Sequence, residues 1–279
     1  MKRIYSINGF AVLLLLTLSF TACKKLDHDE GFTSIGEVYF DVSGAPALYG
    51  FLKVKYNGTP IDAQLYSGTT YRVRVPEGES TFQFYKGETA GDILAEKTVN
   101  IVPESPETLL LFQPTENAAV AILDPSEQAN EEAAPEGYLK IKIANYANTA
   151  LPLDKYDIVV EGDDGWNGWQ VLSVIKGVGT NLEGETYHLV AKGAQMYSYR
   201  FTYSIPSTGE FVLNARGTVY TSGGVWEYPN PTPQKNVFTF FLSESKDREL
   251  EGATNAQKGR GTVVDGWIYS ITPNILFAY

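Results

Sequence analysis

Apolar and polar residues alternate along much of the chain, which predicts β-strands. The clearest run is residues 197–205, where Tyr197, Tyr199, Phe201 and Tyr203 share one parity and the residues between them are polar or charged. Successive strand residues point to opposite faces of a sheet, so this period predicts one buried face. Because the other face is polar, we interpret the aromatic face as core and not as a sugar-stacking platform.

The strand candidates fall into two blocks, residues 35–123 and 138–279. Asn57-Gly58 in the first block predicts a hairpin, because both residues tolerate positive φ. The candidates in the first block are residues 37–42, 51–56, 70–75, 81–85, 93–102, 108–112 and 120–123. Those in the second begin with the alternation around 139–143 and continue at 156–161, 169–175, 186–191, 197–205, 211–220, 237–242, 263–271 and 275–279.

Residues 124–137 separate the blocks and contain two prolines, four glutamates and no apolar period. This composition predicts a linker. Only residues 243–258 have a mixed helical composition, weakened by Gly252. Many short strands joined by turns are typical of sandwiches. We therefore expect an all-β fold with two β-sandwich domains, immunoglobulin-like in architecture only, since the paired cysteines of true immunoglobulin domains are missing.

The N-terminus has the layout of a secretory signal peptide over residues 1–22. Lys2 and Arg3 precede an apolar run at 10–20, which is shorter than the roughly 20 residues that span a bilayer. Thr21 and Ala22 then precede Cys23, and this ending resembles the lipobox of bacterial lipoproteins. The resemblance implies cleavage before Cys23 and acyl chains on its sulfur, with residues 23–34 as a lipidated tether.

Lys24 and Lys25, followed by acidic residues, resemble the export tag of surface lipoproteins in the Bacteroidota. The resemblance implies a chain anchored in the outer membrane through Cys23 and exposed at the cell surface. With 33 acidic and 22 basic residues, the formal net charge is −11, which repels phosphate backbones and argues against nucleic-acid partners. Cys23 is the only cysteine, so its acylation leaves no disulfide and no cysteine metal site.

Two local patterns carry a wider resemblance. Residues 71–78, Tyr-Arg-Val-Arg-Val-Pro-Glu-Gly, form a strand-then-turn phrase common in transthyretin-like sandwiches, and residues 151–159 form a second phrase. The chain resembles Bacteroidota cell-surface lipoproteins with tandem immunoglobulin-like or transthyretin-like β-sandwich modules of unknown function. That resemblance implies a surface or adhesive role and no known reaction.

Catalytic chemistry has little support in the sequence. His28 lies in the tether and His188 in a strand candidate, where we expect a half-buried structural residue, so a histidine triad or zinc site is not predicted. No phosphate-cradling glycine loop is present, and no cofactor is expected. A glycosidase needs only two carboxylates, but solvated turns explain the candidates better, and we predict no enzymatic activity. The candidates by residue type are Asp163, Asp164, Glu183 and Glu185.

The segment 162–169 is the strongest binding candidate. Indoles stack on the apolar faces of sugars, while Asp and Asn accept or donate hydrogen bonds to hydroxyl groups. Its candidate ligand-binding residues are Asp163, Asp164, Trp166, Asn167 and Trp169. Their oxygens also suit calcium, but the spacing of a calcium loop is missing and no metal site is predicted. The alternative interpretation is that Trp169 plugs the core and Trp166 caps a hairpin.

A second candidate segment holds Trp226 and Tyr228 beside Pro229, Pro231 and Pro233, which stiffen the loop. Two functions remain open. The first, which we favour from sequence, is a non-catalytic surface-anchored lipoprotein that mediates adhesion or assembly with an envelope partner. The other is a glycan-binding lipoprotein associated with an outer-membrane polysaccharide uptake system.

Overall fold

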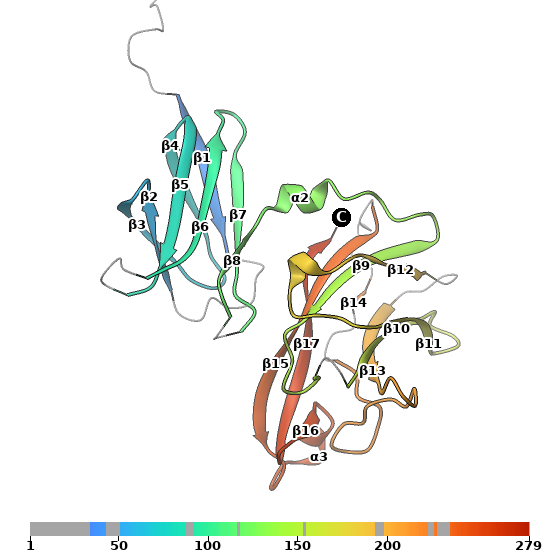
Figure 1. Cartoon of the computed structure of the whole chain (residues 1–279). Helices are drawn as coiled ribbons and strands as arrows, with labels where there is room; N and C mark the ends of the chain where they lie inside the picture. The colour runs from blue at the N-terminus through green and yellow to red at the C-terminus, as the bar shows by residue number, and fades with distance from the viewer. Residues whose placement is uncertain are drawn as a thin grey trace, which may run out of the picture.

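The prediction of an all-β fold is confirmed. The computed structural model describes residues 34–42, 51–87, 92–115, 118–152, 155–192, 198–222, 226–227 and 235–278. Within these ranges the strands form four sheets, and the α-helices are the short α2 (Pro125–Ala129) and α3 (Asn255–Lys258) (Figure 1). The predicted signal peptide, Cys23 and Tyr228 lie outside the described residues.

Residues 34–123 form two four-stranded sheets, which we call the N-terminal sandwich. One sheet has the order β4-β1-β7-β8, and the other has the order β3-β2-β5-β6. The strands are β1 (Ile35–Asp41), β2 (Leu52–Tyr56), β3 (Thr59–Leu65), β4 (Thr70–Pro76), β5 (Gly78–Tyr85), β6 (Ile93–Ile101), β7 (Glu107–Phe112) and β8 (Ala121–Leu123). One core lies between the sheets: the Phe40 ring on β1 meets the Phe82 ring on β5 edge to face, with centroids 5.2 Å apart.

The predicted hairpin at Asn57-Gly58 is confirmed, with φ of 47° and 79° at its two residues. It joins β2 to β3, a strand that the sequence pattern did not mark. Pro60 and Asp62 disfavour a strand, but the pairing of β3 with β2 places it at the edge of its sheet, where both are tolerated. Ala63 and Leu65 supply its buried face.

Residues 138–278 form the C-terminal sandwich. A four-stranded sheet with the order β11-β10-β13-β14 packs on a five-stranded sheet with the order β12-β9-β15-β17-β16. The strands are β9 (Tyr138–Asn145), β10 (Asp157–Asp163), β11 (Trp169–Ile175), β12 (His188–Ala191), β13 (Ser198–Ser204), β14 (Trp226–Glu227), β15 (Val237–Glu249), β16 (Thr262–Val264) and β17 (Trp267–Ala278).

The aromatic face of β13 is core, as predicted, at three of its four residues, and the fourth, Tyr197, lies outside the described residues. Tyr199, Phe201 and Tyr203 are each at most 1% exposed, and the Phe201 ring meets Phe240 of the opposite sheet with centroids 5.1 Å apart. His188 is half-buried on β12, also as expected.

Three strand predictions in this block were wrong in their bounds. Residues 211–220 are not one strand but a tight turn held by isolated bridges, with Gly217 at φ 79°. Residues 263–271 are not one strand, because a turn at Asp265 and Gly266, both at positive φ, separates β16 from β17. Residues 275–278, expected as a separate strand, belong to β17. The expected helical stretch at 243–258 is helical only at α3, because residues 243–249 extend β15 and pair with β17.

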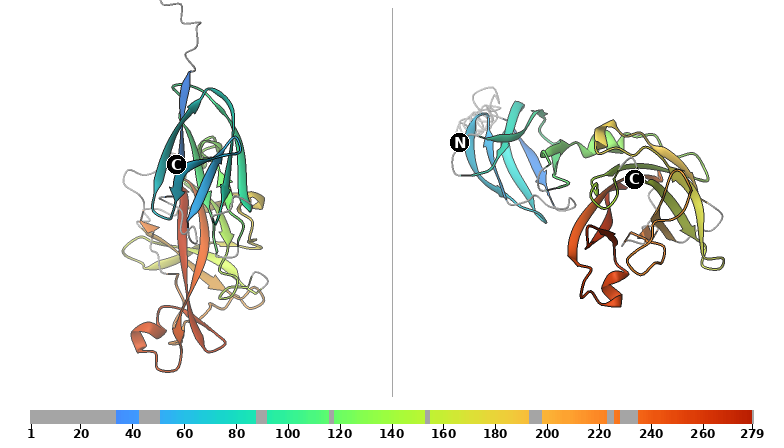
Figure 2. Two further views of the ribbon diagram at one scale, coloured as in Figure 1. Left: turned by 90° about the vertical axis from the view of Figure 1, so that its left-hand side faces the viewer. Right: turned by 60° about the horizontal axis from the view of Figure 1, so that its bottom comes forward.

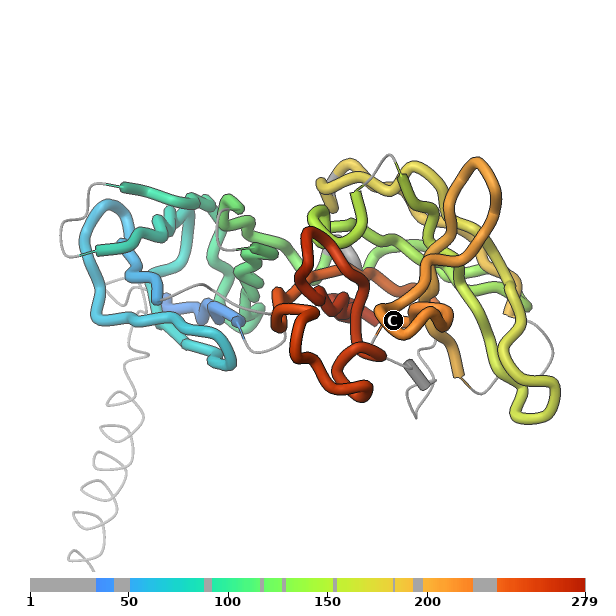
Figure 3. Tube along the Cα trace, turned by 90° about the horizontal axis from the view of Figure 1, so that it is seen from below, coloured from blue at the N-terminus to red at the C-terminus, as the bar shows by residue number. Residues whose placement is uncertain are grey.

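A third apolar cluster joins the two sandwiches, and we call it the inter-sandwich cluster. It buries Leu110 and Phe112 of β7 with Phe241 of β15 and Phe277 of β17. Figures 2 and 3 show β15 and β17 on the side of the C-terminal sandwich that faces the N-terminal one, with their paired ends extending beyond it. The predicted linker contains α2, and the Lys235 ammonium donates to two backbone carbonyls of this segment.

Candidate functional site

The Trp-rich candidate segment is the tip of the β10–β11 hairpin. Asp163 pairs with Trp169 at the last step of the ladder, so residues 164–168 form the turn. Gly165 and Gly168 have φ of 78° and 70°, a backbone conformation that other residue types rarely adopt. The two glycines therefore allow a compact turn that reverses the chain within five residues.

Asp164 organises this turn. Its Oδ1 accepts from the backbone N–H groups of Trp166 at 2.9 Å and Asn167 at 2.7 Å. Its Oδ2 accepts from Nδ2 of Asn167 at 2.6 Å. Asp163 makes a similar local bond, because its Oδ1 accepts from the Gly165 N–H at 2.8 Å. Side-chain oxygens thus replace the missing backbone partners of the turn.

These bonds favour the ionised carboxylate of Asp164. The hydrogen bond from the Asn167 backbone, then that from the Asn167 side chain, and then that from the Trp166 backbone lower the pKa of Asp164 below its ordinary value of 3.8. Both Asp164 oxygens accept hydrogen bonds inside the turn, so this residue positions the loop.

Trp166 projects into solvent from this turn with 87% of its surface exposed. The alternative interpretation holds in one half only. Trp166 lies in the turn of the β10–β11 hairpin, whereas Trp169 is half-buried and lies outside the hydrophobic core of the C-terminal sandwich. The sequence therefore placed the two indoles in the correct loop, while the structure gives them different roles.

Trp169 belongs to the base of the loop. The Arg200 guanidinium lies over its ring at 4.1 Å from the centroid, and Nε of Arg200 is 2.7 Å from Oε2 of Glu161. Glu161 and Arg200 are directly opposed on β10 and β13. The contacts between Glu161, Arg200 and Trp169 therefore connect the strands β10, β13 and β11 beneath the turn. Sequence reasoning missed Arg200 and Glu161, because only the strand pairing brings them to Trp169.

The second candidate segment reaches the same end of this sheet through its backbone. Ser198 of β13 pairs with Asp163 on one side and with Glu227 of β14 on the other. Trp226 pairs with Tyr199, one step along. The candidate segments therefore flank β10 and β13 at one sheet end.

Of the carboxylates considered for catalysis, Asp163, Asp164 and Glu185 are not gathered into one site, and the Glu183 side chain lies outside the described part of the structure. Glu185 accepts from the Gly179 N–H at 2.6 Å in a separate loop, and Asp163 and Asp164 serve their own turn. Within the described ranges, no group of three or more histidine, cysteine, aspartate or glutamate side chains is placed to hold a metal ion.

No helix in the described part of the chain is long and apolar enough to cross a membrane. No protein-family model matches the sequence, and no curated protein matches it.

Among solved structures, the chain is similar to an α-glucan-binding streptococcal virulence factor, with 13% identity, a TM-score of 0.22, and 74% of this chain and 92% of that chain covered. It is also similar to family 41 carbohydrate-binding modules of streptococcal virulence factors, with 14% identity, a TM-score of 0.21, and coverage of 74% and 93%. A glycogen-degrading pneumococcal virulence factor matches with 14% identity, a TM-score of 0.23, and coverage of 74% and 21%. At TM-scores this low, these likenesses carry no argument about this chain.

Proposed function

We propose that this protein is a non-catalytic, lipid-anchored glycan-binding protein that stacks a sugar on Trp166. The observation that carries the proposal is the 87% exposure of this indole on a turn fixed by side-chain hydrogen bonds. An exposed indole offers a flat apolar face and an N–H donor, the two groups that recognise a sugar ring and its hydroxyls.

The fixed turn favours binding because little freedom is lost when a ligand arrives. Asp164 fixes the backbone at Trp166, and the Arg200–Trp169 stack fixes the strand that follows. Immobilising a flexible side chain or loop on binding costs about 0.5–1.5 kcal/mol per side chain. A loop that is ordered beforehand avoids much of this cost.

Polar acceptors lie beside the indole. Oδ2 of Asp163 and Oδ1 of Asn167 have no hydrogen-bond partner within the described residues, while the other polar atom of each side chain is held in the turn. Both oxygens are therefore oriented and available to accept from sugar hydroxyls.

The sheet end is wide enough for more than one sugar ring. The first candidate segment joins β11 to β10, and β14 of the second segment lies three strand spacings from β11 and two from β10, about 14 Å and about 10 Å at the usual spacing. An extended oligosaccharide that stacks on Trp166 can follow this end toward Trp226. We therefore expect chains of several sugars to bind better than single sugars.

A glycan array probed with the purified mature chain tests the proposal. We expect binding that is lost in Trp166→Ala, because the indole supplies the stacking surface. Removal of so exposed a side chain changes stability by only about 0.5 kcal/mol or less. Tyr66→Ala is the matched control, since Tyr66 is an aromatic residue 56% exposed in a turn of the N-terminal sandwich. Equal binding by Trp166→Ala and the unaltered chain would refute the role of this loop.

Adhesion or assembly through a sheet edge remains the second proposal. It is favoured by β11, an edge strand on which Val171 and Val174 are 52% and 41% exposed. Exposed edge strands accept an added strand from a partner. A Val171→Lys, Val174→Lys double variant should reduce adhesion of cells that display the protein and leave glycan-array binding intact. Unchanged adhesion would remove β11 from this role.

A further inference from the structure

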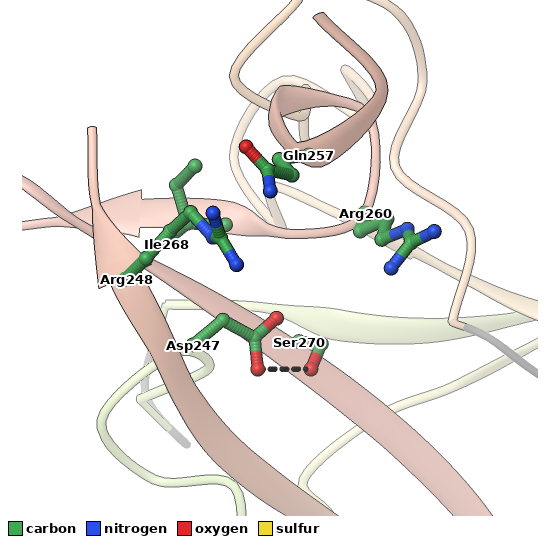
Figure 4. Close-up of a pocket in the computed structure, with 6 residues that line it drawn as sticks. All are labelled: Asp247, Arg248, Gln257, Arg260, Ile268 and Ser270. Carbon is green, nitrogen blue, oxygen red and sulfur yellow. Dashed lines mark hydrogen bonds between the residues drawn. The ribbon is translucent and has the colours of Figure 1, made fainter. Parts of the chain in front are cut away.

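A pocket separate from the Trp166 loop opens near the end of the β15–β17 pair, against α3. Its volume is about 360 Å³. Its lining residues come from three segments, as Figure 4 shows, and are Asp247, Arg248, Gln257, Arg260, Ile268 and Ser270. We propose that this pocket binds a sugar acid, a ligand with one carboxylate and neighbouring hydroxyl groups.

A β-bulge builds one wall of the pocket. Lys246 pairs with Tyr269 and Arg248 with Ile268, so Asp247 is an extra residue in β15 with no partner in the ladder. Consecutive residues of a regular strand point to opposite faces, whereas a bulge redirects them. Asp247 and Arg248 can therefore both line the pocket. The bulge gives the site one acidic and one basic group side by side.

The capping box of α3 orients Gln257. Oε1 of Gln257 accepts from the Thr254 N–H at 2.8 Å, and Oγ1 of Thr254 accepts from the Gln257 N–H. The amide oxygen is thus in use, and in Figure 4 the Nε2 group points toward the open space between the labelled side chains. Gln257 therefore presents a donor to the pocket.

Arg260 is positioned by close packing of the backbone that follows it. A Cβ at Gly261 would lie 2.2 Å from the carbonyl oxygen of Tyr269, so only glycine allows the chain to run this close to β17. Arg216 supports the same segment from outside, since its Nε donates to the Asn255 carbonyl. The backbone that carries Gln257 and Arg260 is consequently held in place by the fold.

The two arginines point to an anionic ligand. Within the described residues, neither Arg248 nor Arg260 has an ion-pair or hydrogen-bond partner for its side chain, although the chain is acidic overall. A guanidinium group matches a carboxylate with two parallel hydrogen bonds. The pocket thus holds two unused anion-binding groups.

Asp247 narrows the choice of anion. Its Oδ1 accepts from the hydroxyls of Ser245 at 2.6 Å and Ser270 at 3.1 Å, and its Oδ2 has no partner within the described residues. A carboxylate in the wall repels a doubly charged phosphate more than a single carboxylate, and it accepts hydrogen bonds from ligand hydroxyls. Ile268 adds an apolar surface for ring C–H groups. A hydroxylated monocarboxylate offers each of these groups a partner of matching chemistry.

Titration of the mature chain with methyl glucuronoside and methyl glucoside, followed by backbone amide shifts in NMR, tests the proposal. These probes differ only at C6, which is a carboxylate in the glucuronoside and a hydroxymethyl group in the glucoside. We expect the glucuronoside to shift amides of residues 247–248 and 257–261, and the glucoside to leave them unchanged. Arg248→Gln and Arg260→Gln should each weaken binding about tenfold or more, the effect of losing one charge-assisted hydrogen bond.

Arg74→Gln is the control for charge, because it removes one exposed arginine from the N-terminal sandwich. Both pocket arginines are exposed, so their variants should keep the fold, which the amide spectrum itself reports. Equal shifts with the glucoside, equal shifts with acetate or inorganic phosphate, or full binding by both pocket variants would each overturn the proposal. Trp166→Ala should bind the glucuronoside normally, which separates this site from the proposed function.

Discussion

The ring of Phe112 meets the ring of Phe241 edge to face, with centroids 4.8 Å apart. Phe112 ends β7 of the N-terminal sandwich, and Phe241 lies in β15 of the C-terminal sandwich. Both are at most 1% exposed, although neither belongs to the main core of its own sandwich. The ring of Tyr146 also packs against this pair, with its centroid 5.8 Å from that of Phe112. The contact between the sandwiches is therefore a small apolar core of its own.

Phe112→Ala should uncouple the two sandwiches. Loss of a buried phenylalanine typically costs about 3–5 kcal/mol, and here the lost contacts are those between the two units. We expect calorimetry to resolve two unfolding transitions in this variant and small-angle scattering to show a broader distribution of interatomic distances. Phe82→Ala, in the N-terminal core, should destabilise that sandwich without broadening the distribution. An unchanged calorimetric profile for Phe112→Ala would contradict a coupling role.

Acid should release the Trp166 loop through Asp164. The pKa of Asp164 is lower in the folded loop than its ordinary 3.8, because the ionised form accepts bonds from Asn167 and Trp166. Its contribution to loop order is thus present above about pH 4 and is lost as the pH falls through the folded value. Fluorescence anisotropy of Trp166 should fall in that range, in a variant whose other tryptophans are replaced by phenylalanine.

The same measurement on Asp164→Asn provides the control. An amide has no titration in this range, so the variant should show a mobile indole at every pH tested. Glycan binding by this variant should weaken at neutral pH, because the loop must then be ordered on binding. An acid transition of the same size in Asp164→Asn would show that another group orders the loop.

Arg200→Ala should destabilise the C-terminal sandwich more than an ordinary surface change. The Glu161 side chain is only 8% exposed, so removal of its cation leaves a nearly buried carboxylate without compensation. Breaking such a pair typically costs about 3–5 kcal/mol. Chemical denaturation measures the loss, and the Glu161→Ala, Arg200→Ala double variant should recover part of it. A loss below about 1 kcal/mol, the usual range for an exposed pair, would contradict the buried character of this bridge.

Local patterns predicted those features of the fold that depend on neighbouring residues. The bounds 169–175 of β11 follow from its short apolar run after Gly168, and the Asn57-Gly58 hairpin follows from two residues that accept positive φ. The signal at Asp265-Gly266 was equally local, but the apolar residues on both sides of it suggested a single strand. In the structure, the two residues that accept positive φ form a turn and end the strand there.

Long-range pairing accounts for the features that the sequence did not reveal. The Arg200–Trp169 stack requires β13 to pair with β10 and β10 with β11, which no window of sequence specifies. The pocket at Asp247 likewise depends on a bulge opposite β17, and the extension of β15 was mistaken for helical composition. The exposed Trp166 and its local support Asp164 lay within reach of sequence reasoning, whereas Arg200 and Glu161 did not.

Lipidation of Cys23 remains a prediction from the sequence. Cells that express the unaltered chain should incorporate labelled palmitate into the protein, because the lipobox-like ending implies thioether and amide-linked acyl chains. Cys23→Ser should abolish labelling and release the protein from the membrane pellet, since the acyl chains supply about 0.8 kcal/mol per buried methylene. Persistence of the Cys23→Ser form in the pellet after a salt wash would point to a different anchor.

Two neighbouring glycines offer a test of the framework behind the arginine pocket. At Gly261 an added Cβ meets the Tyr269 backbone at 2.2 Å, which cannot move without breaking the β16–β17 pairing. At Gly259 the nearest atoms, 3.1 Å away, belong to the flexible side chain of Arg216, which needs to shift by only a few tenths of an ångström. Gly261→Ala should therefore lower stability by about 1–3 kcal/mol, as overpacking does, and should displace Arg260. Gly259→Ala should change stability little. Denaturation midpoints and glucuronoside titration of both variants check this, and equal behaviour of the two would show that the segment after α3 does not set the shape of the pocket.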